Sequence, residues 1–207
     1  MSTLQEQVRE RALTLGAPFG LVPDKVTVPI MSEDPESVKG LSVIARRLAA
    51  ASFAIRLANA LLVDEDDDET RATIRETSRN YGVDYDMTQR EISLLHGDNT
   101  ERDIEDVKGS EEAMAVVAWA LNGGPAPVDP TKPSDIDAAH NVVIRGEHIQ
   151  KLMEQAELVP QLEVAALIDL YRLYAEQGIG DQKLVRARRV ALEWFLVREN
   201  DWLRIRF

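Results

Sequence analysis

Nine consecutive apolar residues, from Ala113 to Leu121, constrain this chain more than any other feature. A helix over this stretch has no polar face to turn toward water, so other elements have to surround it. The neighbouring segments also indicate helices, because Thr88 with Glu91 and Thr100 with Asp103 have the spacing of capping boxes. The sequence therefore predicts a central buried helix packed among further helices.

Helical spacing continues through the rest of the chain, and strand alternation is nearly absent. We expect a first helix over about residues 3 to 15 and a long one from Pro35 to Val63. Residues 17–31 contain three prolines and predict an extended arm, and residues 123–135 contain four and predict a loop. The prediction is an all-α fold, a bundle of about seven or eight helices in which residues 1–207 form a single domain.

Composition limits the classes of partner. The 207 residues carry a net charge of -12, which repels nucleic acid and anionic membranes, and we expect neither as a partner. The chain has no cysteine, which excludes zinc–thiolate sites, iron–sulfur clusters and cysteine nucleophiles. Because the N-terminal segment is charged and no long uninterrupted apolar run occurs, we expect a cytoplasmic protein.

Arg188 is the most unusual residue of the C-terminal helix, because it falls among apolar positions while Arg186 and Arg189 fall on the outer face. A buried guanidinium needs a carboxylate, and Glu112 and Asp169 are candidate partners on otherwise apolar helices. Glu112, Asp169, Arg172 and Arg188 could form an anion-recognising or catalytic pocket. The same residues could instead form a structural ion-pair network that locks three helices, and we favour this second interpretation.

For metal binding, the useful spacing is Asp137-x-x-His140, with His148 eight residues later. A di-iron bundle requires two Glu-x-x-His pairs and two further glutamates, and only this one loose analogue occurs. No nucleotide-binding loop, nucleophile elbow or HExxH motif is present either. We therefore expect no metal and no cofactor.

The C-terminal segment is basic and aromatic. Residues 183–207 contain seven basic and three acidic residues, a local net charge of +4 in an acidic chain. Arginine and tryptophan are frequent anchors of protein interfaces. We expect a protein partner, or a second copy of this chain, to dock on a surface made of Arg186, Arg189, Arg198 and Trp202.

The segments "EEAMAVVAWALN", "LIDLYRLYAEQG" and "LVRARRVALEWF" together resemble the uncharacterised bacterial domain-of-unknown-function family 4272. The resemblance spans most of the chain and implies a helical intracellular protein of about this length. It implies the fold more than the function, because no activity comes with it.

Two functions remain open. The absence of catalytic motifs and the basic, aromatic end favour a cytosolic helical interaction or regulatory module. The alternative is a small-molecule-binding domain or an enzyme with a polar pocket around Asp169, Arg172 and Arg188.

Overall fold

Helices account for nearly all of the regular structure in the computed structural model, which describes residues 3–23, 39–63, 68–122 and 125–196. Within these ranges there is no strand, so the all-α prediction is confirmed. The α-helices are α1 (Leu4–Gly16), α2 (Leu41–Val63), α3 (Asp68–Tyr81), α4 (Gln89–His96), α5 (Glu101–Lys108), α6 (Glu111–Asn122), α7 (Ile136–Gly146), α8 (Ile149–Gln155), α9 (Gln161–Gln177) and α10 (Gln182–Leu196), and single 3-10 turns occur at Ala17–Phe19 and Asp84–Asp86.

Capping boxes set several helix starts as the sequence predicts. The side chains of Thr3, Thr88 and Thr100 each accept a hydrogen bond from the backbone N–H three residues later. The acidic side chain at that later position accepts one from the backbone N–H of the cap residue. α2 differs from its prediction: it begins at Leu41, because the carbonyl of Gly40 accepts the first helical bonds. The proposed cap at Asp34 and Pro35 lies outside the described residues.

The segment after the proline loop divides into two helices, α7 and α8. α7 ends at Gly146, and the next residue, Glu147, has a positive φ of 59°. Only a few per cent of non-glycine residues adopt this conformation, and it turns the chain into α8. The side chain of His148 then caps α8 by accepting a hydrogen bond from the N–H of Lys151 at 3.2 Å.

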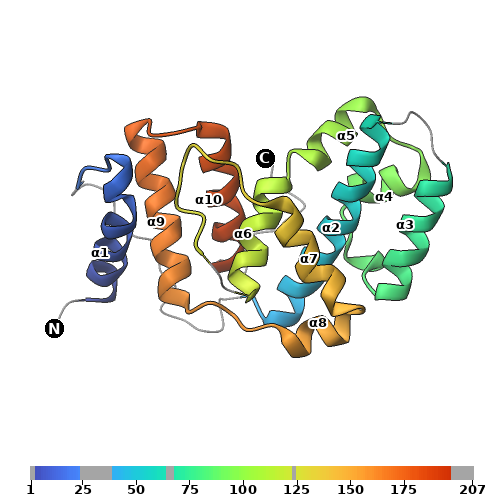
Figure 1. Cartoon of the computed structure of the whole chain (residues 1–207), viewed down its shortest axis with the longest axis horizontal. Coiled ribbons are helices and arrows are strands. Elements are labelled where there is room, and N and C mark those ends of the chain that lie inside the picture. Colours follow the sequence, from blue (N-terminus) through green and yellow to red (C-terminus); the bar gives the residue numbers. More distant parts are fainter. Residues whose placement is uncertain (1–2, 24–38, 64–67, 123–124, 197–207) are drawn as a thin grey trace.

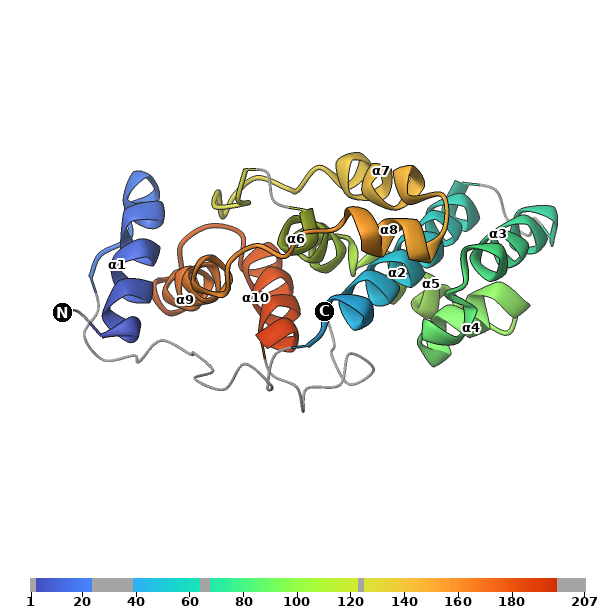
Figure 2. The same cartoon turned by 90° about the horizontal axis from the view of Figure 1, so that it is seen from below.

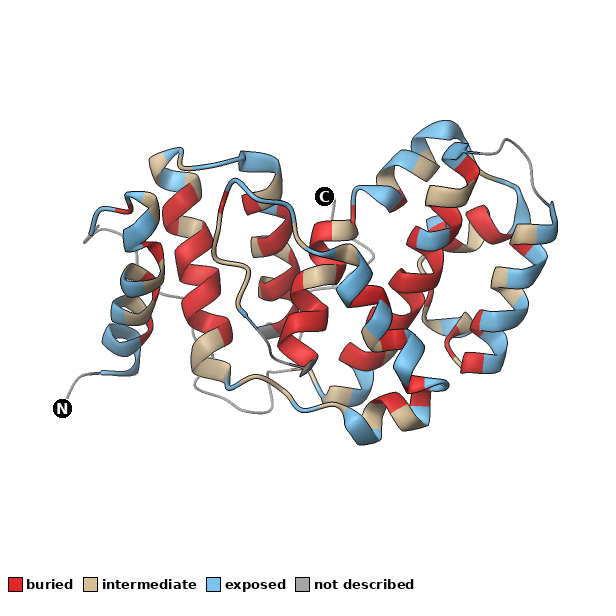
Figure 3. Cartoon of the chain, viewed as in Figure 1, coloured by how far each residue is buried: buried red, intermediate tan, exposed pale blue. Residues whose placement is uncertain are grey.

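The helices follow one another across the molecule. Figure 1 shows α1, α9, α10 and α6 side by side, then α7 and α2, and finally α3, α4 and α5 at the far end; Figure 2 shows the same order from below. Buried residues gather along the faces between these helices (Figure 3). α6 is buried as its apolar run predicts, and it contacts α10, α7 and α2. This places α6 and α10 together near the middle of the row.

The predicted arm and loop are partly described. After the 3-10 turn at Ala17–Phe19, the arm continues without regular structure to residue 23, and residues 24–31 lie outside the described part. Residues 125–135 form a loop that has no regular secondary structure and crosses α9, α10 and α6 (Figure 1). Among the described residues, no helix combines the length and the apolar character that a membrane span requires.

Candidate functional site

α10 places Arg188 on its inner face, where the side chain is only 1 % exposed. Its neighbours on that face, Val185, Ala191 and Leu192, are buried apolar residues, so this turn of α10 has to pack against α6 and α9. The Nε atom of Arg188 donates to Oε2 of Glu112 on α6 at 2.8 Å. Glu112 is therefore the partner of the buried guanidinium, as one of the two sequence candidates predicts.

The remaining donors of Arg188 point at the backbone of the proline loop. Nη1 donates to the carbonyl oxygens of Asp129 at 2.7 Å and of Pro127 at 3.5 Å, and Nη2 donates to that of Lys132 at 2.5 Å. A loop with four prolines cannot satisfy its carbonyls in a helix or a sheet, because proline has no N–H to offer. The guanidinium supplies the missing donors, and the loop curves around it.

Glu112 completes this arrangement from the other side. Its carboxylate accepts hydrogen bonds from the backbone N–H of Ser134 at 2.8 Å and from the Ser134 hydroxyl at 2.7 Å. The loop is thus held at one end through Glu112 and along its length through Arg188. Charge-assisted hydrogen bonds of this kind are stronger than neutral ones, so the pair fixes the path of the loop.

α9 and the start of α10 add further tethers. The hydroxyls of Tyr171 and Tyr174 donate to the carbonyls of Pro127 at 2.7 Å and Val128 at 3.1 Å. Burial raises the pKa of both phenols above the ordinary value, so both hydroxyls keep their protons. The N–H of Asp181 donates to the carbonyl of Pro130 at 2.8 Å. The loop is therefore fastened to three helices before any ligand binds.

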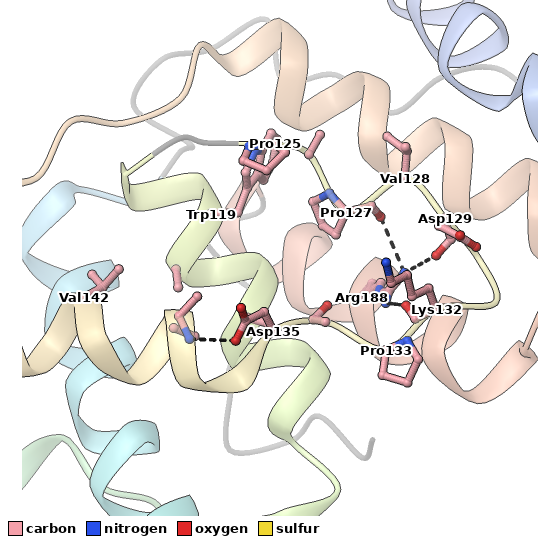
Figure 4. A pocket seen from close by; sticks show the side chains of 16 residues that line it. Trp119, Pro125, Pro127, Val128, Asp129, Lys132, Pro133, Asp135, Val142 and Arg188 are labelled. Carbon is pink, nitrogen blue, oxygen red and sulfur yellow. Dashed lines mark hydrogen bonds between the residues drawn. The ribbon is translucent and has the colours of Figure 1, made fainter.

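A cavity of about 470 Å³ lies between this loop, α6 and the first half of α7 (Figure 4). Most of its wall is apolar, with Trp119 and three of the loop prolines prominent, and Arg188 contributes to the floor. Asp129, Lys132 and Asp135 bring charged groups to it (Figure 4). The lining residues are Ala115, Ala118, Trp119, Pro125, Ala126, Pro127, Val128, Asp129, Lys132, Pro133, Ser134, Asp135, Ala138, Ala139, Val142 and Arg188.

Asp169 does not belong to this site, and its prediction as a partner of Arg188 is wrong. Its fully buried carboxylate accepts bonds from Arg9 on α1, from Nε at 2.6 Å and from Nη2 at 3.1 Å. The reason is topological: α9 lies between α1 and α10, and Asp169 faces α1. Arg172 is half-buried on α9 and does not line the cavity either. Of the three predicted pocket residues, only Arg188 lines this cavity.

The predicted partner surface is only partly within the described residues. Arg186 is exposed on α10, whereas Arg189 is half-buried and forms an ion pair with Glu193 at 3.6 Å. Arg198 and Trp202 lie outside the described part of the chain. Of the four residues predicted for this surface, Arg186 is thus the one that lies within the described residues and is exposed.

The weak metal candidates lie in separate environments. Nδ1 of His140 is 2.7 Å from the Ser52 hydroxyl in a buried contact between α7 and α2, and His148 caps α8. Asp137 is exposed on α7. Within the ranges that the structure describes, no three histidine, aspartate or glutamate side chains gather as a metal site would require.

Two arginines that pair with buried carboxylates were not predicted from the sequence. Arg9 holds Asp169, and Arg47 on α2, which is 6 % exposed, pairs with Glu91 on α4. A signal existed for Arg47, because it lies three residues after Ile44 and four before Ala51, both buried apolar positions of the same helix. Arg9 has the same kind of spacing, because the buried residue Ala12 lies three residues later on the same helix.

Comparison with known proteins gives one family. The family described as "Domain of unknown function (DUF4272)" matches residues 9–205, nearly the whole chain. No curated protein sequence and no solved structure matches the chain.

Proposed function

The chain belongs to the DUF4272 family, and we propose that it is a cytoplasmic regulatory module that binds a small molecule in the cavity beside Arg188. The observation that carries this proposal is the cavity itself, together with the loop that forms one wall. Its volume of about 470 Å³ falls within the range of about 300 to 1,000 Å³ that is usual for small-molecule sites. Such sites are mostly apolar with a few polar groups, which also describes this lining.

Preorganisation of the loop supports a binding role. Arg188, Glu112, Tyr171 and Tyr174 already fix the loop wall through hydrogen bonds. A ligand that enters such a cavity does not have to order the loop, so little of its interaction energy is lost to conformational entropy.

The enzyme alternative with a polar pocket around Asp169, Arg172 and Arg188 has less support. Asp169 is paired with Arg9, and the donors of Arg188 are directed at Glu112 and three loop carbonyls. A guanidinium engaged in this way positions the protein backbone and is poorly placed to bind a substrate anion. Binding of a ligand against the apolar wall is the better-supported function.

A substitution that fills the cavity tests the proposal. Ala138 lines the cavity from the first half of α7 and is exposed, so Ala138→Leu adds volume there with little disturbance of the core. Ala72 is exposed on α3, at the far end of the molecule, and Ala72→Leu is the matched control. A fragment library is screened against both variants and the wild type by thermal shift and by protein-detected NMR.

We expect hits that raise the melting temperature of the wild type and of Ala72→Leu, with NMR shifts concentrated in α6, α7 and the loop. The same hits should not stabilise Ala138→Leu. Stabilisation of all three proteins to the same extent, or hits that map away from the cavity, would overturn the proposal.

A protein partner or a second copy of the chain at the basic end of α10 is the second candidate. The exposure of Arg186 favours it, in a chain whose net charge is -12. The test compares the wild type with an Arg186→Glu and Arg198→Glu double variant by size-exclusion chromatography and by pull-down from lysate. Equal elution volumes and identical recovered proteins would remove this candidate.

A further inference from the structure

The lining of the cavity offers few hydrogen-bond donors, and this limits which ligand fits. Pro125, Pro127 and Pro133 have no N–H group. Both donors of Ser134, its N–H and its hydroxyl, are directed at Glu112, and the N–H of Val128 donates to the carbonyl of Ala126 at 2.8 Å. Arg188 directs its donors at Glu112 and the loop carbonyls. The side-chain donors that remain for a carboxylate or a phosphate are the indole N–H of Trp119 and the exposed ammonium of Lys132.

Acceptors are better represented, because Asp129 and Asp135 both line the cavity. Oδ1 of Asp129 accepts from the N–H of Thr131 at 2.9 Å and from its hydroxyl at 2.8 Å. Oδ1 of Asp135 accepts from the N–H of Ala138 at 2.9 Å. A carboxylate has about four lone-pair sites, so each side chain can still accept a bond from a ligand.

Both carboxylates are held in place by local structure. The bonds from Thr131 lower the pKa of Asp129 below its ordinary value, which keeps this group ionised near neutral pH. Asp135 is the N-cap of α7, and capping orients its side chain at the start of that helix. The two negative groups come from opposite ends of the last part of the loop, residues 129 to 135.

The charge balance around the cavity is slightly negative. The lining contains two anions, Asp129 and Asp135, and two cations, Lys132 and Arg188. Glu112 neutralises Arg188 at 2.8 Å, which leaves Lys132 against two carboxylates. Lys132 and Asp135 are both exposed and Asp129 is half-buried, so solvent screens all three charges, and the excess is one negative charge.

We propose that the ligand of this cavity is a small organic amine, whose apolar body packs against Trp119 and the α6 alanines and whose ammonium group lies near Asp129 and Asp135. This inference rests on the proposed function, since it names the ligand class of the same cavity. Ala115 and Ala118 leave room beside Trp119 for the apolar body. An ammonium group also interacts favourably with the face of an indole ring.

Three matched probes test the proposal: benzylamine, benzyl alcohol and benzoate share one aromatic body and differ in charge. Their dissociation constants are measured by NMR titration against the wild type, Ala138→Leu, Asp129→Asn, Asp135→Asn and Lys132→Gln. Asparagine keeps the turn at residue 129 and the helix cap at residue 135, so these variants remove charge and retain local structure.

We expect benzylamine to bind about tenfold more tightly than benzyl alcohol and benzoate to bind most weakly, as one charged contact in a partly exposed site predicts. Asp129→Asn and Asp135→Asn should each weaken benzylamine binding about threefold to tenfold and leave benzyl alcohol unchanged. Lys132→Gln should strengthen benzylamine binding.

Equal binding of the amine and the alcohol, or no loss in the two asparagine variants, would overturn the amine assignment. The proposed function would survive that outcome if Ala138→Leu abolished binding of the alcohol. If none of the probes, and none of the fragments screened above, distinguished Ala138→Leu from the wild type, the proposed function would fail and the amine assignment with it.

Discussion

Two buried arginine–glutamate pairs, Arg188 with Glu112 and Arg47 with Glu91, differ in what they hold together. Both arginines are almost inaccessible, at 1 % and 6 % exposed, and each also donates to at least one backbone carbonyl. Arg47 reaches both oxygens of Glu91, whereas Arg188 gives one bond to Glu112 and turns its other donors to the loop. The same two residue types therefore serve different structural purposes.

The surroundings explain the difference. Glu91 is also the acidic member of the capping box of Thr88, so Arg47 ties α2 to the first turn of α4. Arg188 shapes an irregular loop next to a cavity, and it contributes to the floor of that cavity. A buried ion pair is therefore weak evidence for function by itself, and the element that it positions decides whether a ligand site results.

Arg188→Ala should have the largest effect on stability. It removes the partner of a buried carboxylate and leaves the carbonyls of Asp129 and Lys132 without their donors. Breaking one side of a buried pair reduces the free energy of unfolding by about 3 to 5 kcal/mol, and the lost carbonyl contacts favour the upper end. Denaturant unfolding followed by circular dichroism measures this change.

Arg186→Ala, on the exposed face of the same helix, is the control for Arg188→Ala. Its unfolding curve should nearly overlay that of the wild type, because surface substitutions away from special contacts change stability little. Equal transition midpoints for the two variants would show that the buried contacts of Arg188 do not stabilise the fold.

Glu91→Ala should destabilise the protein by a similar mechanism without affecting the cavity. It removes the carboxylate partner of Arg47 and the acidic half of the α4 capping box, for an expected loss of about 3 kcal/mol. Glu91 does not line the cavity. Ligands found for the wild type should therefore bind Glu91→Ala with unchanged affinity at a temperature where it is folded. Weakened binding would show that the two pairs are not independent.

Gly180→Ala should have a smaller effect that is confined to the loop. Gly180 has a φ of 78°, and a β-carbon there would collide with Pro130. Gly178 provides the control, because it has a φ of 66° and open space around it. An alanine there introduces the strained backbone conformation without a collision. Gly178→Ala should cost about 1 kcal/mol, and Gly180→Ala about 1 to 2 kcal/mol more because the loop has to move. Equal free energies of unfolding for Gly178→Ala and Gly180→Ala would mean that the loop moves away from the new β-carbon at no measurable cost.

Much of this fold was predictable because helix starts and burial are local properties. Three capping boxes and the apolar run of α6 appear directly in the sequence, and so does the odd position of Arg188 on α10. Such patterns depend on residues three or four apart, which a helix brings to one face.

Partner choice was less predictable, because a helix that is buried on several sides does not reveal which neighbour each residue faces. Asp169 illustrates this: it was as good a candidate as Glu112 until the order of α1, α9 and α10 was known. The loop carbonyls that bind Arg188 carry no side-chain signature at all, since every residue has one. The cavity could not be predicted for the same reason, because the backbone path of a proline-rich loop forms its wall.

The smallest expected effect concerns the contact between His140 on α7, the helix beside the cavity, and Ser52 on α2, the helix that carries Arg47. Burial lowers the pKa of His140, and the nearby charge of Arg56 lowers it further, against the opposing effects of Asp137 and Glu111. The unfolded chain therefore binds this proton more readily than the folded one. The contribution of His140 to stability is complete above its ordinary pKa of about 6.5 and is lost progressively as the pH falls below it.

The free energy of unfolding should thus decrease between about pH 7 and about pH 5, and it should decrease less in His140→Gln, which keeps a polar group near Ser52. Asn141→Gln, at an exposed position of the same helix and without a titratable group, is the control and should follow the wild type. Since Ala139 and Val142 on the same helix line the cavity, acid should weaken ligand binding in the wild type more than in His140→Gln. Identical pH dependence of the wild type and His140→Gln would mean that the contact between α7 and α2 is insensitive to protonation. The region around Arg47 and the region around Arg188 would then be coupled only through packing.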